Sequence, residues 1–298
     1  MFKPTNNVII AFDGVAPLAK LNQQRSRRYK SWFQTNISNH ILNKECLIKW
    51  NTACITPGTI FMNQLSYEVS NYFNIDFSKK NKIKNTIVSG SNKLGEGEHK
   101  IYDFIRNNSN AHKNETTIVY GLDADLIMLS INHLHICSNI FLYRETPHFI
   151  SSIDESINPL NNYLLDINEL SRCIVLNMTS NDINDIDNVF NFSLSVQYKL
   201  IHDYVFLSFL MGNDFLPHFP ALNIRTNGIN KIMNAYKMVI SNNNIFLTDG
   251  NVIVWNNLRK LIHHLSMLEE QYFIDEHISR EKMENRLTNT DLNNKTLI

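Results

Sequence analysis

Six acidic side chains stand where an apolar run or helix ends or where a helix is expected to begin. They are Asp13, Glu96, Glu98, Asp123, Asp125 and Asp214. In an open parallel sheet, ligands bind in the crevice at the carboxyl ends of the strands, so we expect these acids to converge on one cleft. Converging carboxylates need cations, and a set of oxygen ligands suits Mg²⁺ or Mn²⁺ better than zinc. The sequence therefore predicts a site for two hard divalent ions.

Two such ions, about 3.5–4 Å apart, hold a phosphodiester, activate the attacking water and neutralise the leaving oxygen. Asp123 and Asp125 suit this task if their segment is extended, because residues i and i+2 then point to the same side. Taken alone, each acid is more often a cap or a solvated loop residue, and Glu98 could simply complement the positive end of a helix. Gly95 and Gly97 favour the metal interpretation, because they permit backbone turns that a plain cap does not need.

A basic segment follows the first of these acids directly, at residues 16–32. If it is helical from Pro17, one face presents two guanidiniums, one ammonium and one amide. These groups belong to Lys20, Gln24, Arg27 and Arg28. Such a face matches a terminal phosphate, which offers more acceptor oxygens and more charge than an internal phosphodiester. The alternative is a solvated basic helix, and the position next to Asp13 favours the phosphate site.

The elements that must position these residues alternate between short apolar runs and helical periods. This pattern predicts an α/β fold with a mainly parallel central sheet flanked by helices. The expected strands are 7–14, 116–123 and 140–145. The expected helices, besides the basic one, are 56–74, 97–108, 204–211 and 254–273.

Three details of this organisation can be checked in a structure. The helix at 56–74 is expected to begin with Thr56 as N-cap and Pro57 at the first helical position. Its inward face is expected to carry Phe61, Leu65, Val69 and Tyr72. One nuclease-sized domain is expected over 1–273, with 146–200 as a variable surface insertion and 274–298 as a polar C-terminal tail.

Composition narrows the class of protein. The chain has 298 residues, 43% of them hydrophobic, and its 28 basic and 28 acidic residues give a formal charge of zero, so nucleic-acid binding must rest on local clusters. The four cysteines are widely spaced, without a Cys-x-x-Cys pair, which indicates a reduced intracellular protein, cytoplasmic or nuclear, without structural zinc.

Apolar stretches such as 204–212 are far shorter than the roughly 18 residues of a membrane span, so no membrane partner is expected.

Five segments of the chain resemble, in the same order, the signature segments of the XRN family of 5′-to-3′ exoribonucleases. They are AFDGVAPLAKLNQQRSRR, CITPGTIFM, GEGEHKIYDFIR, YGLDADLIMLS and DYVFLSFLMGNDFLPHFP. Several long motifs are far more specific than one short pattern. The resemblance runs from about Asn7 to Phe273 and is weakest over 146–200.

This resemblance implies a PIN/FEN-like metal-nuclease core in which the six acids bind two Mg²⁺ or Mn²⁺ ions. It also implies that the basic face, Lys20, Gln24, Arg27 and Arg28, holds the 5′-monophosphate of single-stranded RNA. Hydrolysis of the first phosphodiester would then release a nucleoside monophosphate and leave a new 5′-phosphate end. A capped or triphosphate end would be too large for this pocket.

Two histidines lie inside the matching motifs, His99 and His218. They have two interpretations, as acid/base groups or as groups that orient the acids through hydrogen bonds. The second is favoured, because ion-activated water supplies the nucleophile without them.

The resemblance also implies a nuclease domain shortened at both ends. Family members carry a segment before the position of Asn7, with another metal-binding Asp and a His that stacks on the first base, whereas here no acid precedes Asp13. The family's second conserved region, with an aromatic stacking partner, would follow Ile298. Leu18 stands where the family usually has a basic residue.

Three interpretations therefore remain open. The first is an exoribonuclease, either complete in a reduced form or part of a longer product. The second is a flap or DNA-end nuclease of the same superfamily, although no Gly-rich hairpin between helices is found to bind a duplex. The third is a non-catalytic module that binds RNA 5′ ends. The retained acids favour the first.

Overall fold

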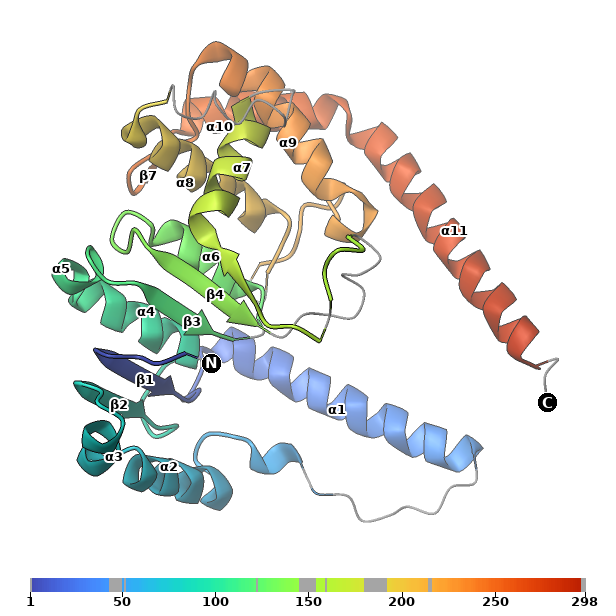
Figure 1. Ribbon diagram of the computed structural model, residues 1–298. Helices are drawn as coiled ribbons and strands as arrows, with labels where there is room; N and C mark the ends of the chain where they lie inside the picture. Colours follow the sequence, from blue (N-terminus) through green and yellow to red (C-terminus); the bar gives the residue numbers. More distant parts are fainter. Residues whose placement is uncertain are drawn as a thin grey trace. The chain divides into compact units, whose positions relative to one another are not determined.

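The computed structural model describes residues 2–42, 50, 52–121, 123–144, 154–158, 160–179, 192–213 and 216–295. These residues form a mixed α/β fold, as expected at the level of fold class. The chain divides into two compact units, residues 1–111 and 112–298. Figure 1 shows the elements in the colours of the sequence.

The first unit contains one pair of parallel strands. β1 (Asn7–Ala11) confirms the first expected strand, and it pairs with β2 (Asn85–Ser89) from Asn7↔Asn85 to Ala11↔Ser89. β2 was not predicted, because its apolar run is short and follows a lysine-rich stretch. Parallel pairing needs a long crossover, whose described residues here form three helices and a short 3-10 turn. These are α1 (Leu18–Ile41), η1 (Thr52–Cys54), α2 (Ile60–Tyr72) and α3 (Ile75–Lys80).

The start of α2 differs from the expected start. Thr59, not Thr56, is the N-cap residue, and its Oγ1 accepts a hydrogen bond from Met62 N at 3.3 Å. Gly58 has a φ of +88° and completes the turn before the helix. The buried face consequently centres on Met62, while Phe61 and Tyr72 are exposed. Thr59 is the N-cap instead of Thr56 because the Thr59 side chain reaches a backbone N–H of the first turn, which has no partner within the helix.

After β2 the first unit ends with α4 (Gly97–Asn107), whose position confirms the prediction. Tyr102 and Ile105 of α4 are buried, and the helix packs on β1. The four-residue helix α5 (Ser109–His112) crosses the division between the two units.

The second unit contains a mixed three-stranded sheet. β3 (Thr117–Tyr120) runs parallel to β4 (Ile140–Arg144), and β5 (Tyr163–Asp166) pairs antiparallel with β4. The short strands β6 (Thr248–Asp249) and β7 (Val252–Ile253) form a separate antiparallel pair. The described strands thus form three small sheets, of which two contain parallel pairs.

Helices supply most of the core of the second unit. α6 (Asp125–Asn132) packs on β4, α7 (Ile167–Thr179) and α8 (Leu194–Leu210). α7 lies inside the expected surface insertion, yet its Val175, Leu176 and Met178 are buried. Its amphipathic pattern was overlooked among the surrounding Asn and Asp residues. No helix among the described residues is both long enough and apolar enough to cross a membrane.

The C-terminal part of the second unit contains α9 (Gly228–Val239), α10 (Trp255–Met267) and α11 (Glu269–Lys295), with η4 (Ile224–Thr226) and η5 (Ser241–Asn243) as short 3-10 turns. The single helix expected at 254–273 is therefore two helices, separated at Leu268.

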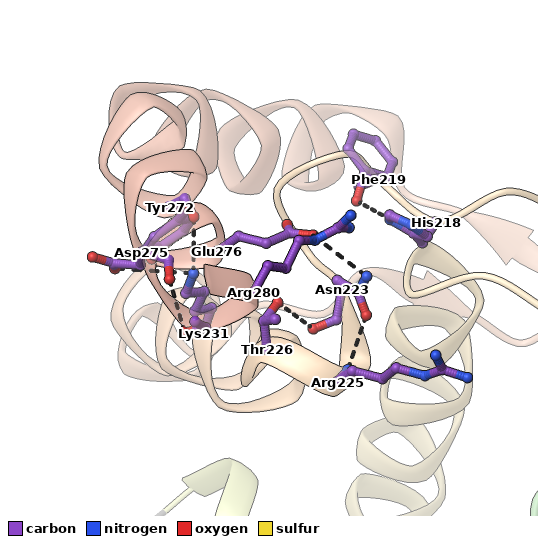
Figure 2. Close-up of polar contacts among 11 residues, drawn as sticks. His218, Phe219, Asn223, Arg225, Thr226, Lys231, Tyr272, Asp275, Glu276 and Arg280 are labelled. Atoms are coloured by element: carbon purple, nitrogen blue, oxygen red, sulfur yellow. Dashed lines mark hydrogen bonds and ion pairs between the residues drawn. The ribbon is translucent and has the colours of Figure 1, made fainter. Parts of the chain in front are cut away.

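Polar side chains hold α11 against the segment that carries η4 and α9 (Figure 2). Glu276 of α11 accepts a hydrogen bond from Asn223 Nδ2 at 3.4 Å and also pairs with Arg280. Lys231 Nζ lies 4.4 Å from the centre of the Tyr272 ring. The expected polar tail at 274–298 is thus helical over its described part, 274–295.

Candidate functional site

The N-terminus of α4 gathers two of the predicted metal ligands. Glu96 is the residue that precedes the helix, and Glu98 lies in its first turn, where the helix dipole favours carboxylates. Each of Glu96, Glu98 and His99 offers a ligand atom within 4.8 Å of the others. Asp13 joins the same helix end differently, because its Oδ1 accepts a hydrogen bond from Gly97 N at 2.6 Å. The structure therefore brings Asp13, Glu96 and Glu98 together in the first unit.

Two glycines allow the backbone to build this arrangement. Gly14 N donates to Gly95 O at 2.8 Å, so the loop after β1 lies directly against the loop before α4. A Cβ on Gly14 would lie 1.8 Å from Lys93 O, which is far inside contact distance. A Cβ on Gly97 would lie 3.0 Å from Ala11 O. Only glycine at position 14 permits the approach that places Asp13 at the start of α4.

Glu96 is the most buried of the predicted acids among the described residues, with an exposed fraction of 3%. Its Oε2 accepts a hydrogen bond from Lys20 Nζ at 2.6 Å. Its Oε1 is buried and has no hydrogen-bond partner within the described part of the chain. A buried carboxylate oxygen without a donor is costly unless a cation or water satisfies it. With Glu98 and His99 beside it, this oxygen suits a divalent ion that prefers oxygen ligands.

The predicted phosphate face lies on α1, which begins after Pro17 and carries no Asp or Glu over its 24 residues. Lys20 and Gln24 are half-buried, whereas Arg27 and Arg28 are exposed. Lys20 is the member of this face that contacts Glu96. The basic face and the acidic group, predicted from separate motifs, therefore meet at the ion pair between Lys20 and Glu96.

Lys100 is a residue of this site that sequence reasoning missed. Its Nζ donates to Phe12 O at 2.8 Å and to Gly90 O at 3.1 Å, so it ties together the segments that follow β1 and β2. Burial lowers the pKa of Lys100, and the nearby carboxylate of Asp13 partly offsets this effect. Its position one turn after Glu96 in the sequence could have marked it as a residue of the site. Its two carbonyl partners, however, come together through the pairing of β1 with β2, which the sequence does not reveal.

Asp123 and Asp125 belong to the second unit, and both are exposed. The argument that their segment is extended was wrong, because Ala124 has helical angles (φ −69°, ψ −25°) and α6 begins at Asp125. Asp123 Oδ1 instead accepts a hydrogen bond from Asp125 N at 3.3 Å, as a residue preceding a helix commonly does. A Cβ on Gly121, just before them, would lie 2.2 Å from Leu126 Cδ1, so the Leu126 side chain would have to move.

The remaining predicted residues have different outcomes. Asp214 lies outside the described residues. His218 is exposed, and its Nδ1 lies 2.7 Å from Phe219 O (Figure 2). His99 belongs to the acidic group described above, where it can serve either as a ligand or as an orienting group. Convergence of the acids of the first unit with those of the second stays a prediction.

Comparison with protein families identifies two matching regions. The family described as XRN 5′-3′ exonuclease N-terminus matches residues 1–146. The family described as Xrn1 helical domain matches residues 196–297. The predicted acids at positions 13 to 125 and the phosphate face lie in the first region, and Asp214 lies in the second.

Curated relatives align along nearly the whole chain. The 5′-3′ exoribonuclease 2 of Arabidopsis thaliana is 31% identical over 92% of this chain, and that of Saccharomyces cerevisiae is 30% identical over 95%. The 5′-3′ exoribonuclease 1 of Homo sapiens is 28% identical over 98%. This chain spans 31%, 31% and 18% of the lengths of these three proteins, respectively. From the two family matches and these alignments, the chain belongs to the XRN family of 5′-3′ exonucleases.

Proposed function

We propose that this chain is a divalent-metal-dependent 5′-to-3′ exoribonuclease. Its substrate is single-stranded RNA with a 5′-monophosphate, and its products are nucleoside monophosphates. The printed names of the relatives, all 5′-3′ exoribonucleases, support the reaction. Because the chain spans about a third of the length of the first two, the activity of those whole proteins comes to it only as a proposal.

The observation that carries this proposal is the contact between Lys20 and Glu96 at 2.6 Å. A phosphate-binding cation and a metal-binding carboxylate must lie close together if the bond to be cut is the first one after the bound 5′-phosphate. An enzyme that cut at a distance from the end would not need this proximity. The contact therefore favours removal of the terminal nucleotide.

The proposal assigns the metal ions, two Mg²⁺ or Mn²⁺, to the six acids. These are Asp13, Glu96, Glu98, Asp123, Asp125 and Asp214. When bound, such ions supply Lewis-acid stabilisation of the phosphodiester and lower the pKa of the attacking water. The α4 N-terminus positions Asp13 through Gly97 N, and Lys100 holds the Phe12 carbonyl next to it. Precise support of this kind matters because metal affinity depends on how the ligands are oriented.

The 5′-phosphate is assigned to the basic face of α1, Lys20, Gln24, Arg27 and Arg28. A guanidinium donates two parallel hydrogen bonds to phosphate oxygens, and the ammonium adds a compact charge. The monophosphate carries more charge than an internal phosphodiester, so this face selects the 5′ end over the rest of the RNA. Exclusion of capped and triphosphate ends by size belongs to the same proposal.

The finer assignments of fold and location are also proposals. A mainly parallel central sheet in a PIN/FEN-like nuclease core is supported by the parallel pairs β1–β2 and β3–β4. A nuclease domain over 1–273, with 146–200 as its variable insertion and 274–298 as its tail, is part of the proposal. The interval between the two family matches supports the insertion, whereas the second match runs to residue 297 and includes most of the proposed tail. A cytoplasmic location, with the nucleus as the alternative, fits Cys54, Cys137 and Cys173, which form no disulfide.

The test is degradation of one uniformly labelled RNA with a 5′-monophosphate, a 5′-triphosphate or a 5′-hydroxyl, in Mn²⁺ or in EDTA. We expect Mn²⁺-dependent loss of the monophosphate RNA alone, with mononucleotides as the first products. Glu98→Gln and Asp123→Ala should abolish this loss. Asp103→Asn is the matched control for Glu98→Gln, because Asp103 is an exposed acid on α4 that pairs with Arg106.

Two results would contradict the proposal. Equal degradation of all three RNAs would remove the role of the 5′-phosphate. Release of oligonucleotides, instead of mononucleotides, from the 5′ end as the first products would indicate an endonuclease or a flap nuclease. Preferential binding of the monophosphate RNA without cleavage would instead support a non-catalytic module that binds RNA 5′ ends.

A further inference from the structure

We infer that one side of α1 binds single-stranded RNA beyond its 5′-terminal nucleotide, with bases stacked on three exposed aromatic rings. This side, the aromatic face, consists of Arg25, Tyr29, Trp32 and Phe33. The inference rests on the proposed function, because it takes single-stranded RNA as the substrate. It adds a second RNA contact that requires neither the 5′-phosphate nor the metal ions.

The helical spacing places these residues on one side of α1. Arg25, Tyr29 and Phe33 follow one another at intervals of four residues. Trp32 comes three residues after Tyr29, and side chains at both spacings are neighbours on a helix. The centre of the Tyr29 ring lies 6.0 Å from that of Trp32 and 6.2 Å from that of Phe33. These distances are within the range of aromatic contacts, so the three rings form one continuous surface.

This surface does not belong to the core of the first unit. None of the 24 residues of α1, all of which lie in the described part of the chain, is buried. The exposed fractions of Tyr29, Trp32 and Phe33 are 64%, 62% and 46%. Figure 1 shows that α1 extends away from β1 and β2. Aromatic side chains gain free energy when they leave water, and a cluster of exposed ones indicates a binding surface.

The charges around the rings favour a polyanion as the partner. α1 contains no Asp or Glu, and Arg25, Arg28 and Lys30 are exposed beside the rings. Arg25 and Arg28 are one turn apart, and like charges at this spacing destabilise a helix. An anion bound between them removes this repulsion. Protein interfaces also use Tyr, Trp and Arg, but a protein partner would need a strongly acidic surface here. Single-stranded RNA supplies a phosphate for each cation and a base for each ring.

The aromatic face lies within reach of RNA at the proposed cleavage site. It runs beside the phosphate face on the same helix. Lys20, which contacts Glu96, precedes Tyr29 by nine residues, or about 14 Å along the helix axis. In the proposed function, the 5′ nucleotide occupies the phosphate face and the first phosphodiester lies at the acids. A dinucleotide is used up by these two sites, so only a longer RNA also covers the aromatic face.

The experiment compares Kd values in EDTA, so that no metal-dependent cleavage takes place. The probes are a dinucleotide, a single-stranded RNA of about 16 nucleotides and an abasic chain of the same length, each with a 5′-phosphate or a 5′-hydroxyl. In Tyr29→Ala and Trp32→Ala the Kd of the long RNA should rise about 10-fold, because one stacking ring is lost. The Kd values of the dinucleotide and of the abasic chain should stay unchanged. Trp32→Phe, which keeps a ring, should retain most of the affinity.

Tyr67→Ala is the matched control for Tyr29→Ala. Tyr67 lies on α2 of the same unit, and its exposed fraction is also 64%. Its replacement should leave every Kd unchanged. Alanine is the strongest helix former, so the replacements at these exposed helix positions should preserve the fold, which circular dichroism checks.

Arg25→Gln tests the charge of the aromatic face separately from its rings. For the long RNA, the slope of log affinity against log salt concentration should become shallower by about 0.7, the contribution of one phosphate contact on a single strand. Trp32→Ala should keep the slope of the wild type, because it removes a base contact and no charge.

Each outcome decides a different question. An unchanged Kd of the long RNA in both Tyr29→Ala and Trp32→Ala would overturn the inference and leave the face to a protein partner. An equal loss for the abasic chain, or in Tyr67→Ala, would overturn it as well, because the effect would not come from stacking on this face. Equal binding of 5′-phosphate and 5′-hydroxyl probes would overturn the 5′-end selectivity of the proposed function. Ring-dependent binding of the long RNA would still support the inference in that case. Absence of any RNA binding by the wild type would overturn both.

Discussion

Each unit of the molecule contains a buried carboxylate, and the fold satisfies the two very differently. In the second unit Asp203 is fully buried and accepts four hydrogen bonds, from Tyr236 Oη at 2.7 Å, Leu247 N at 2.8 Å, and Thr248 N and Oγ1 at 2.8 and 2.7 Å. In the first unit Glu96 is almost as buried, but it has one ammonium on Oε2 and no partner for Oε1 among the described residues.

This difference shows how a structural acid can be told from a functional one. Asp203 lies on α8, and its donors belong to α9, to β6 and to the residue before β6. This carboxylate therefore joins elements of the core and has no acceptor capacity left for a ligand. Burial raises its pKa, and the four hydrogen bonds oppose that shift. Glu96 instead retains an acceptor oxygen next to Glu98 and His99. A buried acid that its own fold leaves partly satisfied is the better candidate for binding.

The largest expected effect is on stability, from Asp203→Asn. The amide places an NH₂ group where the carboxylate accepts hydrogen bonds from fixed donors, so at least one donor loses its acceptor. We expect the free energy of unfolding of the second unit to fall by about 3 kcal/mol, measured by urea denaturation. Asp249→Asn is the control, since Asp249 is exposed and pairs with Lys199 at 3.0 Å; it should cost about 0.5 kcal/mol or less. Equal effects of the two substitutions would contradict the structural role of Asp203.

The next effect is on metal affinity, from Glu96→Gln. Replacing one oxygen ligand by an amide should weaken Mn²⁺ binding by about 10–100-fold, measured by calorimetry. Stability should change less than in Asp203→Asn, because Glu96 contributes one ion pair and not a network. Asp103→Asn on the same helix should leave Mn²⁺ affinity unchanged. A stability loss in Glu96→Gln as large as that in Asp203→Asn, with normal Mn²⁺ binding, would mean that Glu96 is structural.

A third buried acid sharpens the comparison. Glu276 of α11 is 5% exposed, and its Oε2 also lacks a hydrogen-bond partner among the described residues, but its Oε1 accepts hydrogen bonds from Asn223 and Arg280 (Figure 2). It belongs to no described group of acids and histidines with ligand spacing. We expect Glu276→Gln to cost about 1 kcal/mol of stability and to leave Mn²⁺ affinity unchanged. Weaker Mn²⁺ binding in this variant would show that an unsatisfied oxygen by itself marks a metal ligand.

The smallest expected effect concerns pH and a buried base, His112. Burial lowers its pKa below the ordinary value of 6.5, and Glu115 partly offsets this shift. The folded state therefore binds the proton of His112 less tightly than the unfolded state does. The contribution of neutral His112 to the free energy of unfolding is complete above pH 6.5 and decreases as the pH falls through the folded pKa. We expect Tm to fall by a few degrees between pH 7.5 and pH 5.5.

The control for this effect is His112→Gln, which cannot titrate in that range. Its Tm should depend less on pH than that of the wild type. His202, whose pKa burial also lowers, contributes in the same direction and should account for part of the remaining dependence. An unchanged pH dependence in His112→Gln would exclude His112 as the source.

Local patterns predicted the elements that are strong by themselves. The strands β1, β3 and β4 and the helix α4 lie where apolar runs and helical period placed them. Predictions failed where two local signals competed, as at Thr56 and Thr59, or where an amphipathic helix such as α7 lies within a polar region. The extended geometry assumed for Asp123 and Asp125 was wrong, because Ala124 between them has helical backbone angles and α6 begins at Asp125.

The sequence by itself determined the residue types of the site and the family, because motifs and helical faces are properties of neighbouring residues. Only the tertiary structure decided which of these residues meet. Lys20 and Glu96 are 76 positions apart, and Lys100 reaches the Phe12 carbonyl across 88 positions. Such contacts depend on the parallel pairing of β1 with β2 and on the close approach at Gly14, which no local pattern specifies. For the same reason, burial of Asp203 under four donors could not be foreseen from an acid in an apolar helix.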